Sequence, residues 1–218
     1  MEGVRNPMNR IVLSAENITK DFNRRPVFRD ISFSLSSPSS LAITGKNGAG
    51  KSTLSKILAG LLCSTRGSLT YTVNDKQVGI EEFKHSIGFV SPYLNLYDEF
   101  TALENLQVLS RIRASTQQNE GKMKDLLNLV SLWQRKDDLV GTFSSGMKQR
   151  LKYAFALLQN PMVLILDEPT SNLDEEGIEF VRRVVQKQKE EGVLIVATND
   201  KAEAGWCAQE IHVGLPKS

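Results

Sequence analysis

Three segments in the N-terminal third of the chain alternate between apolar and polar residues. Residues 31–35 read Ile-Ser-Phe-Ser-Leu, residues 69–73 read Leu-Thr-Tyr-Thr-Val, and residues 11–15 follow a similar alternation. Alternation with a period of two is typical of a strand that buries one of its faces. These segments therefore predict an antiparallel sheet.

A second kind of strand is predicted from short apolar segments without alternation, at residues 41–44, 87–90, 163–166 and 193–198. Apolar residues at helical spacing predict helices between them, over residues 51–62, 151–159 and 175–190. Strands that alternate with helices imply right-handed crossovers and a parallel sheet. The chain is therefore expected to combine a parallel sheet with the antiparallel one.

Residues 92–150 have a different pattern, and we expect them to be helical. Thr101 and Glu104 have the spacing of a capping box, which opens a helix that we expect to end near residue 113. A second helix is predicted over residues 122–132. The sequence thus predicts an α/β fold with an antiparallel β subdomain and an α-helical subdomain inserted over about 92–150.

Length and charge narrow the class of protein. The chain has 218 residues, and we assign residues 10–218 to one domain and residues 1–9 to a flexible polar tail. The 27 basic and 25 acidic residues nearly balance, so no overall field favours nucleic acid as a partner. Apolar runs reach about five residues, well short of the ~18–20 that cross a bilayer.

The N-terminus and the two cysteines give no sign of a signal peptide or of a metal or redox site. The N-terminus has no apolar signal region, and we expect a cytoplasmic protein. Cys63 and Cys207 lie far apart and match no metal or redox spacing. Because Cys63 follows two leucines of a predicted helix, we expect it to be buried as a small apolar residue.

Residues 45–52 carry the strongest chemical signal. They read Gly-Lys-Asn-Gly-Ala-Gly-Lys-Ser between a predicted strand and a predicted helix, the pattern of a phosphate-binding loop. Glycines allow positive φ, so that consecutive backbone N–H groups can point into one concavity. Lys51 would add a cation beside the β- and γ-phosphates, and Ser52 a hydroxyl for Mg²⁺. The predicted nucleotide-contacting residues are Gly45, Lys46, Asn47, Gly48, Ala49, Gly50, Lys51, Ser52 and Thr53.

Two acidic residues end the apolar strand at 163–166. In nucleotide-binding α/β folds such a strand lies beside the strand that feeds the phosphate loop, and its terminal Asp holds Mg²⁺ through water. Asp167 is the predicted metal residue. Glu168, one residue further on, is the predicted base or orienter for the attacking water.

A possible second anion site precedes the helix at 151–159. Residues 143–150 read Phe-Ser-Ser-Gly-Met-Lys-Gln-Arg, and serine and glycine at a helix entry leave free N–H donors and a hydroxyl. Alone this pattern is weak, because Ser-Gly turns before helices are common. Its position 23 residues upstream of Asp167, counted from Ser144, makes it specific.

Taken together, these motifs resemble the ATP-binding subunit of an ABC transporter. The resemblance is carried by the phosphate loop, the segment 144–150, Asp-Glu-Pro-Thr at 167–170 and Ser-Asn-Leu-Asp at 171–174, in that order. It covers about residues 10–212. It implies an ABC ATPase fold, ATP and Mg²⁺ as cofactors, and ATP hydrolysis that powers transport through a separate transmembrane permease.

The resemblance also implies a dimer and a location. Two such subunits, here expected to be identical, would trap two ATP molecules, each between one phosphate loop and Ser144, Gly146 and Met147 of the other chain. Asp174 would contact the partner chain near this shared site. Phe22 matches the aromatic residue that stacks on adenine, although an ordinary core residue is the alternative. The protein would lie on the inner face of the cell membrane through its partner.

Three features depart from the family pattern. The usual Leu-Ser-Gly-Gly-Gln motif is replaced by Phe-Ser-Ser-Gly-Met at 143–147. Pro92 stands where the family has a Gln that reaches Mg²⁺, so that role is absent or supplied by a neighbour. Asn199 stands where a His contacts the γ-phosphate, and a neutral hydrogen bond is weaker than a charge-assisted one. We therefore expect hydrolysis at a slower or differently tuned rate.

Two other functions remain open from the sequence. A soluble ABC-type ATPase without a membrane partner would use the same motifs. A nucleotide-gated module with little hydrolysis is suggested by Pro92 and Asn199. The short chain, without a C-terminal regulatory domain, and the stretch Thr-Ala-Leu-Glu-Asn-Leu at 101–106 slightly favour the export-type group of transporters, which we therefore expect.

Overall fold

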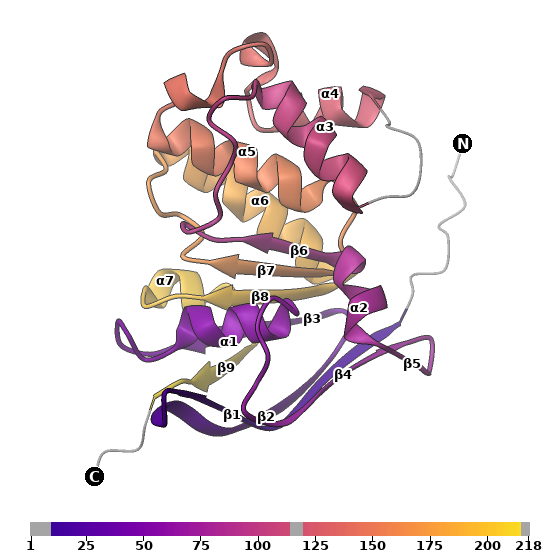
Figure 1. Ribbon diagram of the computed structural model, residues 1–218, viewed down its shortest axis with the longest axis vertical. Helices are drawn as coiled ribbons and strands as arrows, with labels where there is room; N and C mark the ends of the chain where they lie inside the picture. The colour runs from indigo at the N-terminus through magenta and orange to yellow at the C-terminus, as the bar shows by residue number, and fades with distance from the viewer. Residues whose placement is uncertain (1–9, 114–119, 215–218) are drawn as a thin grey trace.

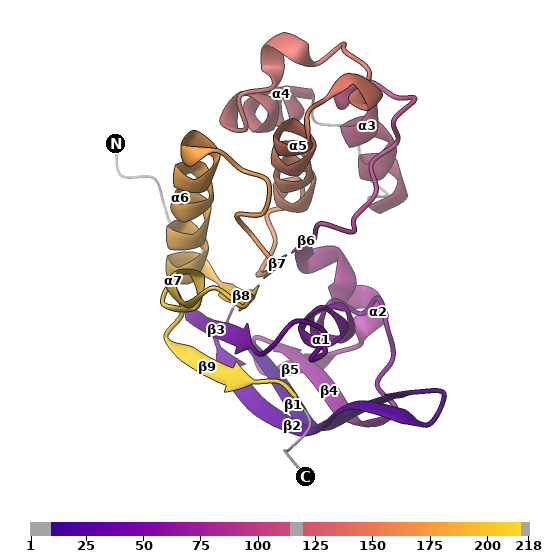
Figure 2. The ribbon, with the colours of Figure 1, turned by 90° about the vertical axis from the view of Figure 1, so that its left-hand side faces the viewer.

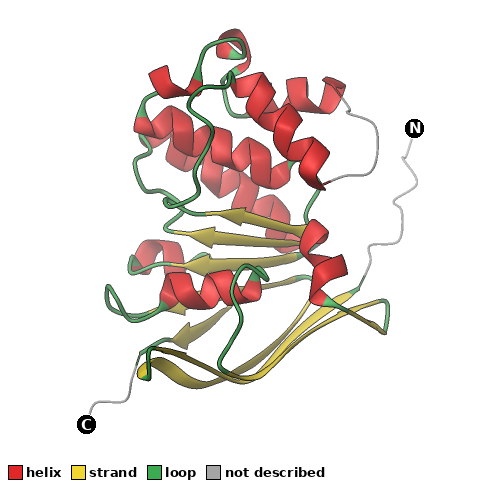
Figure 3. Cartoon of the chain, viewed as in Figure 1, coloured by secondary structure: helices red, strands yellow, loops and turns green. Residues whose placement is uncertain are grey.

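The computed structural model describes residues 10–113 and 120–214. Two sheets lie on either side of helix α1 (Lys51–Leu58), and a group of helices stands beyond the edge of the second sheet (Figures 1 and 2). Figure 3 shows the same separation of helices and strands. The tail predicted at residues 1–9 lies outside the described residues.

The first sheet is antiparallel, as predicted, and has the order β2-β1-β4-β5. Its strands are β1 (Ile11–Phe22), β2 (Arg25–Ser36), β4 (Arg66–Val73) and β5 (Lys76–Val78). The alternating residues predicted to be buried do face inward in part: Leu13, Leu35 and Tyr71 are fully buried. The strands extend beyond the alternating segments, and β5 was not predicted.

The second sheet is parallel and has the order β6-β7-β8-β3-β9. Its strands are β3 (Ser39–Thr44), β6 (Ile87–Val90), β7 (Val163–Asp167), β8 (Val193–Ala197) and β9 (Gln209–His212). The first four match the predicted apolar segments, whereas the largely polar β9 was missed. Figure 2 looks along these strands and shows α1 and α2 (Ile80–Phe83) on one face, α6 (Glu175–Glu191) and α7 (Lys201–Ala204) on the other.

Alternation within β7 decides which way its last residue points. Val163 and Ile165 pack into the core around α1, whereas Leu164 and Leu166 pack into the core that α5 and α6 share. Because successive side chains of a strand point to opposite faces, Asp167 follows Val163 and Ile165 toward α1. This places its carboxylate under the first turn of that helix.

The helices beyond β6 are α3 (Ala102–Arg113), α4 (Glu120–Leu129) and α5 (Ser145–Leu157), with 3₁₀ turns at Trp133–Arg135 and Val140–Thr142. The predicted capping box is present, since Thr101 N donates to Glu104 Oε2 at 2.8 Å and Glu104 N donates to Thr101 Oγ1 at 3.1 Å. The region is less helical than predicted at its start, where residues 92–100 form a loop. Within the described residues no helix has the length and apolar character needed to cross a membrane.

Helix α1 ends four residues before the predicted end at residue 62. Gly60 takes a positive φ of 70°, and Leu61 N donates to Lys56 O at 2.8 Å, which closes the helix with a glycine cap. Cys63 consequently lies beyond the helix and is exposed. The prediction that Cys63 is buried was therefore wrong.

Candidate functional site

The phosphate loop joins the end of β3 to the start of α1. Gly45, Gly48 and Gly50 have φ values of 148°, 79° and 105°, which confirms the predicted positive φ. At Gly50 a Cβ would lie 2.5 Å from Val27 Cγ1, so the position also has no room for a side chain. Gly50 is the N-cap of α1 and no side chain caps it. The first backbone N–H groups of α1 thus remain free to bind an anion.

Lys51 lies inside the curve of this loop. Its Nζ donates to Gly45 O at 3.0 Å and to Lys46 O at 3.4 Å, and the residue is 5% exposed. The loop therefore places a buried cation against the free N–H groups at the start of α1. Positive charge and helix N-terminus together favour a polyanion such as a triphosphate.

Ser52 at the start of α1 contacts Asp167 at the end of β7, because the side chain of Asp167 points toward α1. Ser52 Oγ donates to Asp167 Oδ1 at 3.0 Å, and Asp167 is fully buried. Burial raises the pKa of Asp167 above its ordinary value, while hydrogen bonds from Ser52 and Ser91 oppose that rise. A buried carboxylate is costly, so a cation at this position would be favourable.

The residues present fit Mg²⁺ bound together with a nucleotide. A hydroxyl and a carboxylate are hard oxygen donors of the kind that Mg²⁺ prefers. Across the described ranges, no three His, Cys, Asp or Glu side chains group closely enough to hold a metal. A metal bound by Ser52 and Asp167 would therefore take further ligands from phosphates and water, as Mg²⁺ in nucleotide sites does.

Glu168 follows Asp167 at the carboxyl end of β7. Its φ is 52°, in the left-handed region, and its N–H donates to Ala197 O at 2.9 Å. The residue is half-buried. An unusual backbone angle at such an edge is common where a side chain must be aimed at a ligand. Its role as a base stays a prediction.

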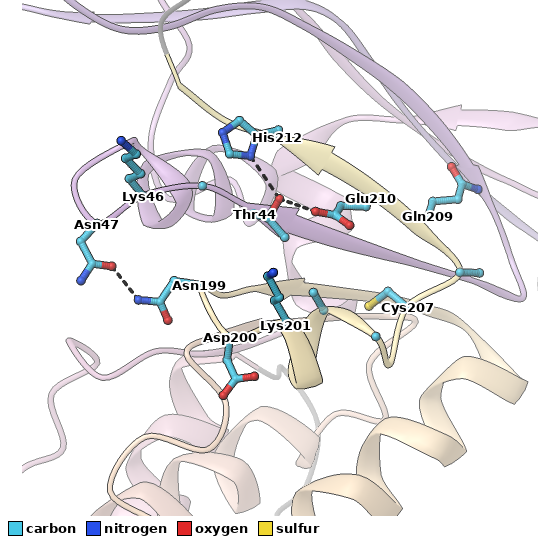
Figure 4. A pocket seen from close by; sticks show the side chains of 14 residues that line it. Thr44, Lys46, Asn47, Asn199, Asp200, Lys201, Cys207, Gln209, Glu210 and His212 are labelled. Atoms are coloured by element: carbon cyan, nitrogen blue, oxygen red, sulfur yellow. Dashed lines mark hydrogen bonds between the residues drawn. The ribbon is translucent and has the colours of Figure 1, made fainter.

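Asn199 lies directly opposite the phosphate loop. Its Nδ2 donates to Asn47 Oδ1 at 2.8 Å, and both side chains are exposed (Figure 4). Asn199 follows β8 in the same alternation that turns Ile195 and Ala197 toward α1. The predicted γ-phosphate residue is thus beside the loop that would hold that phosphate.

Glu203 of α7 is a supporting residue that the sequence did not reveal. It is 5% exposed and accepts hydrogen bonds from the hydroxyls of Thr170 and Thr198, and from Thr170 N at 3.2 Å. Thr198 Oγ1 in turn accepts from Asp200 N at 2.9 Å. Glu203 therefore ties the segment after Glu168 to the segment that carries Asn199.

A cavity of about 940 Å³ opens beside the phosphate loop (Figure 4). Its walls include Lys46, Asn47 and Asn199, together with Gln209, Glu210 and His212 of strand β9. On that strand Glu210 Oε1 accepts from Thr44 Oγ1 at 2.7 Å. The cavity is open enough to leave Lys46 and Asn47 accessible to a ligand.

The predicted second anion site does start a helix. Ser144 is the N-cap of α5, and its Oγ accepts from Met147 N at 3.2 Å. Gly146 lies against Asn172, where a Cβ would be 2.9 Å from the backbone oxygen. Figures 1 and 2 put α5 and α1 on opposite sides of β6 and β7, so these strands separate the two helices within one chain.

Phe22 and Asp174 are placed outside the core. Phe22 ends β1 and is 47% exposed, so the alternative of an ordinary core residue is wrong. Lys20 Nζ lies 4.8 Å from the centre of its ring. Asp174 is the N-cap of α6 and accepts from Gly177 N at 2.9 Å. Its contact with a second chain stays a prediction.

Pro92 lies two residues after the end of β6, and its neighbour Ser91 was missed. Ser91 Oγ donates to Asp167 Oδ2 at 3.2 Å. The contact follows from strand pairing: β6 and β7 pair in parallel with Val90 opposite Leu166, so the next residues on both strands meet. Only the register of the two strands makes this visible.

Comparison with known proteins agrees with the geometry. A family model described as ABC transporter matches residues 28–171. An uncharacterized ABC transporter ATP-binding protein, YybJ of Bacillus subtilis, is 33% identical over 86% of this chain and 84% of its own. The lantibiotic transport ATP-binding protein SrtF of Streptococcus pyogenes is 33% identical over 86% of this chain and 80% of its own. The linearmycin resistance ATP-binding protein LnrL of Bacillus subtilis is 35% identical over 88% of this chain and 62% of its own.

Solved structures give the same fold. An ATP-binding subunit of an ABC transporter superimposes with a TM-score of 0.82 and 26% identity, over 93% of this chain and 86% of its own. A dimeric post-hydrolysis state of the ATP-binding cassette MJ0796, bound to ADP and Pi, has a TM-score of 0.81 and 23% identity, over 93% and 94%. The predicted fold class is confirmed.

Proposed function

Because this chain belongs to the ABC transporter family, as an ATP-hydrolysing subunit that works with a separate membrane protein, we propose that two copies of it close on two Mg-ATP molecules. The observation that carries the proposal is the contact of Ser52 with Asp167 beneath the phosphate loop, at 3.0 Å. It joins a free helix N-terminus, a cation and a metal-binding carboxylate at one place.

Binding would use the phosphate loop and Phe22. The free N–H groups at the start of α1 and the Lys51 ammonium would hold the phosphates, with Thr53 in the same first turn. Phe22 would stack on the adenine with the face of its ring that Lys20 leaves open. Mg²⁺, held by Ser52 and Asp167, would neutralise charge that builds up on the phosphates.

Hydrolysis would depend on Glu168 and Asn199. Glu168 would take the proton of the attacking water, and its position is fixed by its own N–H and by the bonds of Glu203 to the following segment. Asn199 would donate a hydrogen bond to the γ-phosphate after leaving Asn47. Because the amide donor is uncharged, we expect turnover to be slower than with a charged donor.

The second copy would complete each site. The start of α5 has free N–H groups around an exposed Ser144, but β6 and β7 lie between α5 and the helix α1 of its own chain (Figure 2). Dimers are known for the similar cassette MJ0796. We propose that Ser144, Gly146 and Met147 contact the ATP on the partner's loop, with Asp174 close to the same contact.

A groove beside α5 is the proposed site for the membrane partner. Its volume is about 450 Å³, and its lining residues are Pro92, Leu94, Asn95, Leu96, Tyr97, Asp98, Glu99, Lys148 and Lys152. Tyr93 and Tyr97 on the same loop are 73% and 45% exposed, which is high for aromatic residues. An intracellular loop of a transmembrane permease would cover them and hold the protein at the inner face of the membrane.

The direction of transport is proposed from the relatives. Their names include Nod factor export and linearmycin resistance, which both describe movement out of a cell or protection from a compound. We propose that this subunit powers export, in agreement with the expectation from the sequence.

Affinity purification of the full chain from its native membranes tests the partner. We expect a polytopic membrane protein to copurify, and the double variant Tyr93→Ala with Tyr97→Ala to lose it while keeping ATP binding. A partner without membrane spans would instead favour a soluble ABC-type ATPase. If the double variant still copurifies the membrane protein as the wild type does, the partner does not bind at the loop that carries Tyr93 and Tyr97.

A further inference from the structure

The carboxylate of Asp167 is held by hydroxyl groups on both of its oxygens. Ser52 Oγ lies 3.0 Å from Oδ1, and Ser91 Oγ lies 3.2 Å from Oδ2. Ser91 is 1% exposed, so its hydroxyl bonds Asp167 without competition from bulk water. Fixed in this way, the carboxylate has little freedom to rotate before a metal arrives.

The turn that carries Ser91 is itself fastened to α5. Lys152 Nζ donates to Pro92 O at 2.7 Å and to Ser91 O at 3.2 Å. Lys152 is 8% exposed and its charge is met by these two carbonyl oxygens. The nearby cation Lys148 is occupied by Asp98, at 2.7 Å. A buried ammonium of this kind is costly unless its hydrogen bonds are made, so it resists separation from the turn.

Lys152 also lies on the helix that carries the proposed ATP-contacting residues, and it lines the groove proposed for the membrane partner. It lies eight residues after Ser144 on the same helix, about 12 Å along the axis. Its side chain lines the groove proposed for the membrane partner, as does Pro92. A rigid helix therefore connects the ATP-contacting tip, the groove and the Ser91–Pro92 turn.

We propose that Ser91 and Lys152 together replace the missing glutamine: Ser91 positions Asp167 for Mg²⁺, and Lys152 ties that position to α5. Both act through Asp167 and are positioning residues. The inference rests on the proposed function, because it assumes that Asp167 serves a metal bound with ATP. It differs from the family pattern, in which one side chain does both tasks.

The test measures metal dependence of nucleotide binding rather than turnover. A fluorescent ATP analogue is titrated onto the full chain in EDTA and at increasing Mg²⁺. Mg²⁺ should strengthen binding of the analogue, and in Ser91→Ala we expect the Mg²⁺ concentration that gives half of this effect to rise about tenfold. A change of this size corresponds to the loss of one hydrogen bond to a charged group. Lys152→Met should shift it in the same direction, and binding in EDTA should stay as in the wild type.

Matched variants separate positioning from general damage. Ser91→Thr and Lys152→Arg keep the hydroxyl and the charge, and each should restore most of the metal response. Ser40→Ala removes another buried hydroxyl, 2% exposed and bonded to Ala208 N at 2.9 Å, and should leave the metal response unchanged. The double variant of Ser91 and Lys152 should shift the response no more than the larger single change, because both act on one turn.

Each other result overturns the inference. An unchanged metal response in Ser91→Ala or Lys152→Met removes the proposed role, as does a loss of binding in EDTA, which marks structural damage. A shift of equal size in Ser40→Ala would have the same meaning. If the wild type itself binds no nucleotide at any Mg²⁺ concentration, the proposed function has failed and not only this inference.

Discussion

Replacing Glu168 by glutamine is expected to lower ATP turnover by about 100-fold or more and to leave ATP binding intact. Glutamine has the size of glutamate but cannot take a proton from water, and a positioned base contributes about 10²–10⁴-fold. The backbone at this position, with φ 52°, suits the two side chains equally. ATP that is bound and not cleaved should then hold the two copies together.

The measurement is phosphate release at saturating Mg-ATP, with size-exclusion chromatography of the same samples. The Glu168→Gln protein should elute as an ATP-dependent dimer, whereas the wild type should revert to monomer as it hydrolyses ATP. Asn199→His, measured alongside, should raise turnover because a charged donor replaces the neutral amide. Equal turnover in wild type and Glu168→Gln would favour a nucleotide-gated module that hydrolyses little.

Replacing Lys51 by alanine is expected to weaken ATP binding about 10- to 100-fold, because a hydrogen bond to a charged group contributes roughly 1.5–3 kcal/mol. The ammonium is 5% exposed and is held by Gly45 O and Lys46 O inside the loop. Its loss removes a side-chain cation that is buried against the start of α1. Turnover should fall with binding.

Lys187→Ala is the matched control, since it removes one positive charge from an exposed position of α6. Isothermal titration with ATP and Mg²⁺ should give wild-type affinity for this variant. Wild-type affinity in Lys51→Ala as well would show that the loop does not grip the phosphates in the proposed manner.

The sequence was most informative where chemistry depends on neighbours in the chain. The glycines, Lys51 and Ser52 lie within eight consecutive residues, so strand, turn and helix could be predicted together. Alternation along β7 then decides the direction of Asp167, and a one-residue shift would have pointed it away from α1. Local pattern and strand period together account for this part of the site.

The rest depended on which strands pair and where helices end. Ser91 meets Asp167 only because Val90 pairs with Leu166, and Glu203 reaches Thr170 from 33 residues away. Neither contact leaves a pattern of its own. Cys63 was misplaced because the positive φ of Gly60 ends α1 early, although Gly occurs inside helices as well.

Mixing two inactive variants tests whether each ATP is shared between two chains. Lys51→Ala damages the phosphate loop, and Ser144→Asp keeps a good helix cap while placing a negative charge against the phosphates. Each protein alone should turn over ATP at only a small fraction of the wild-type rate. Random pairing makes about half of the dimers mixed, each with one intact site of two, so the mixture should recover about a quarter of wild-type turnover. A mixture no more active than the two variants measured separately would contradict a site built from two chains.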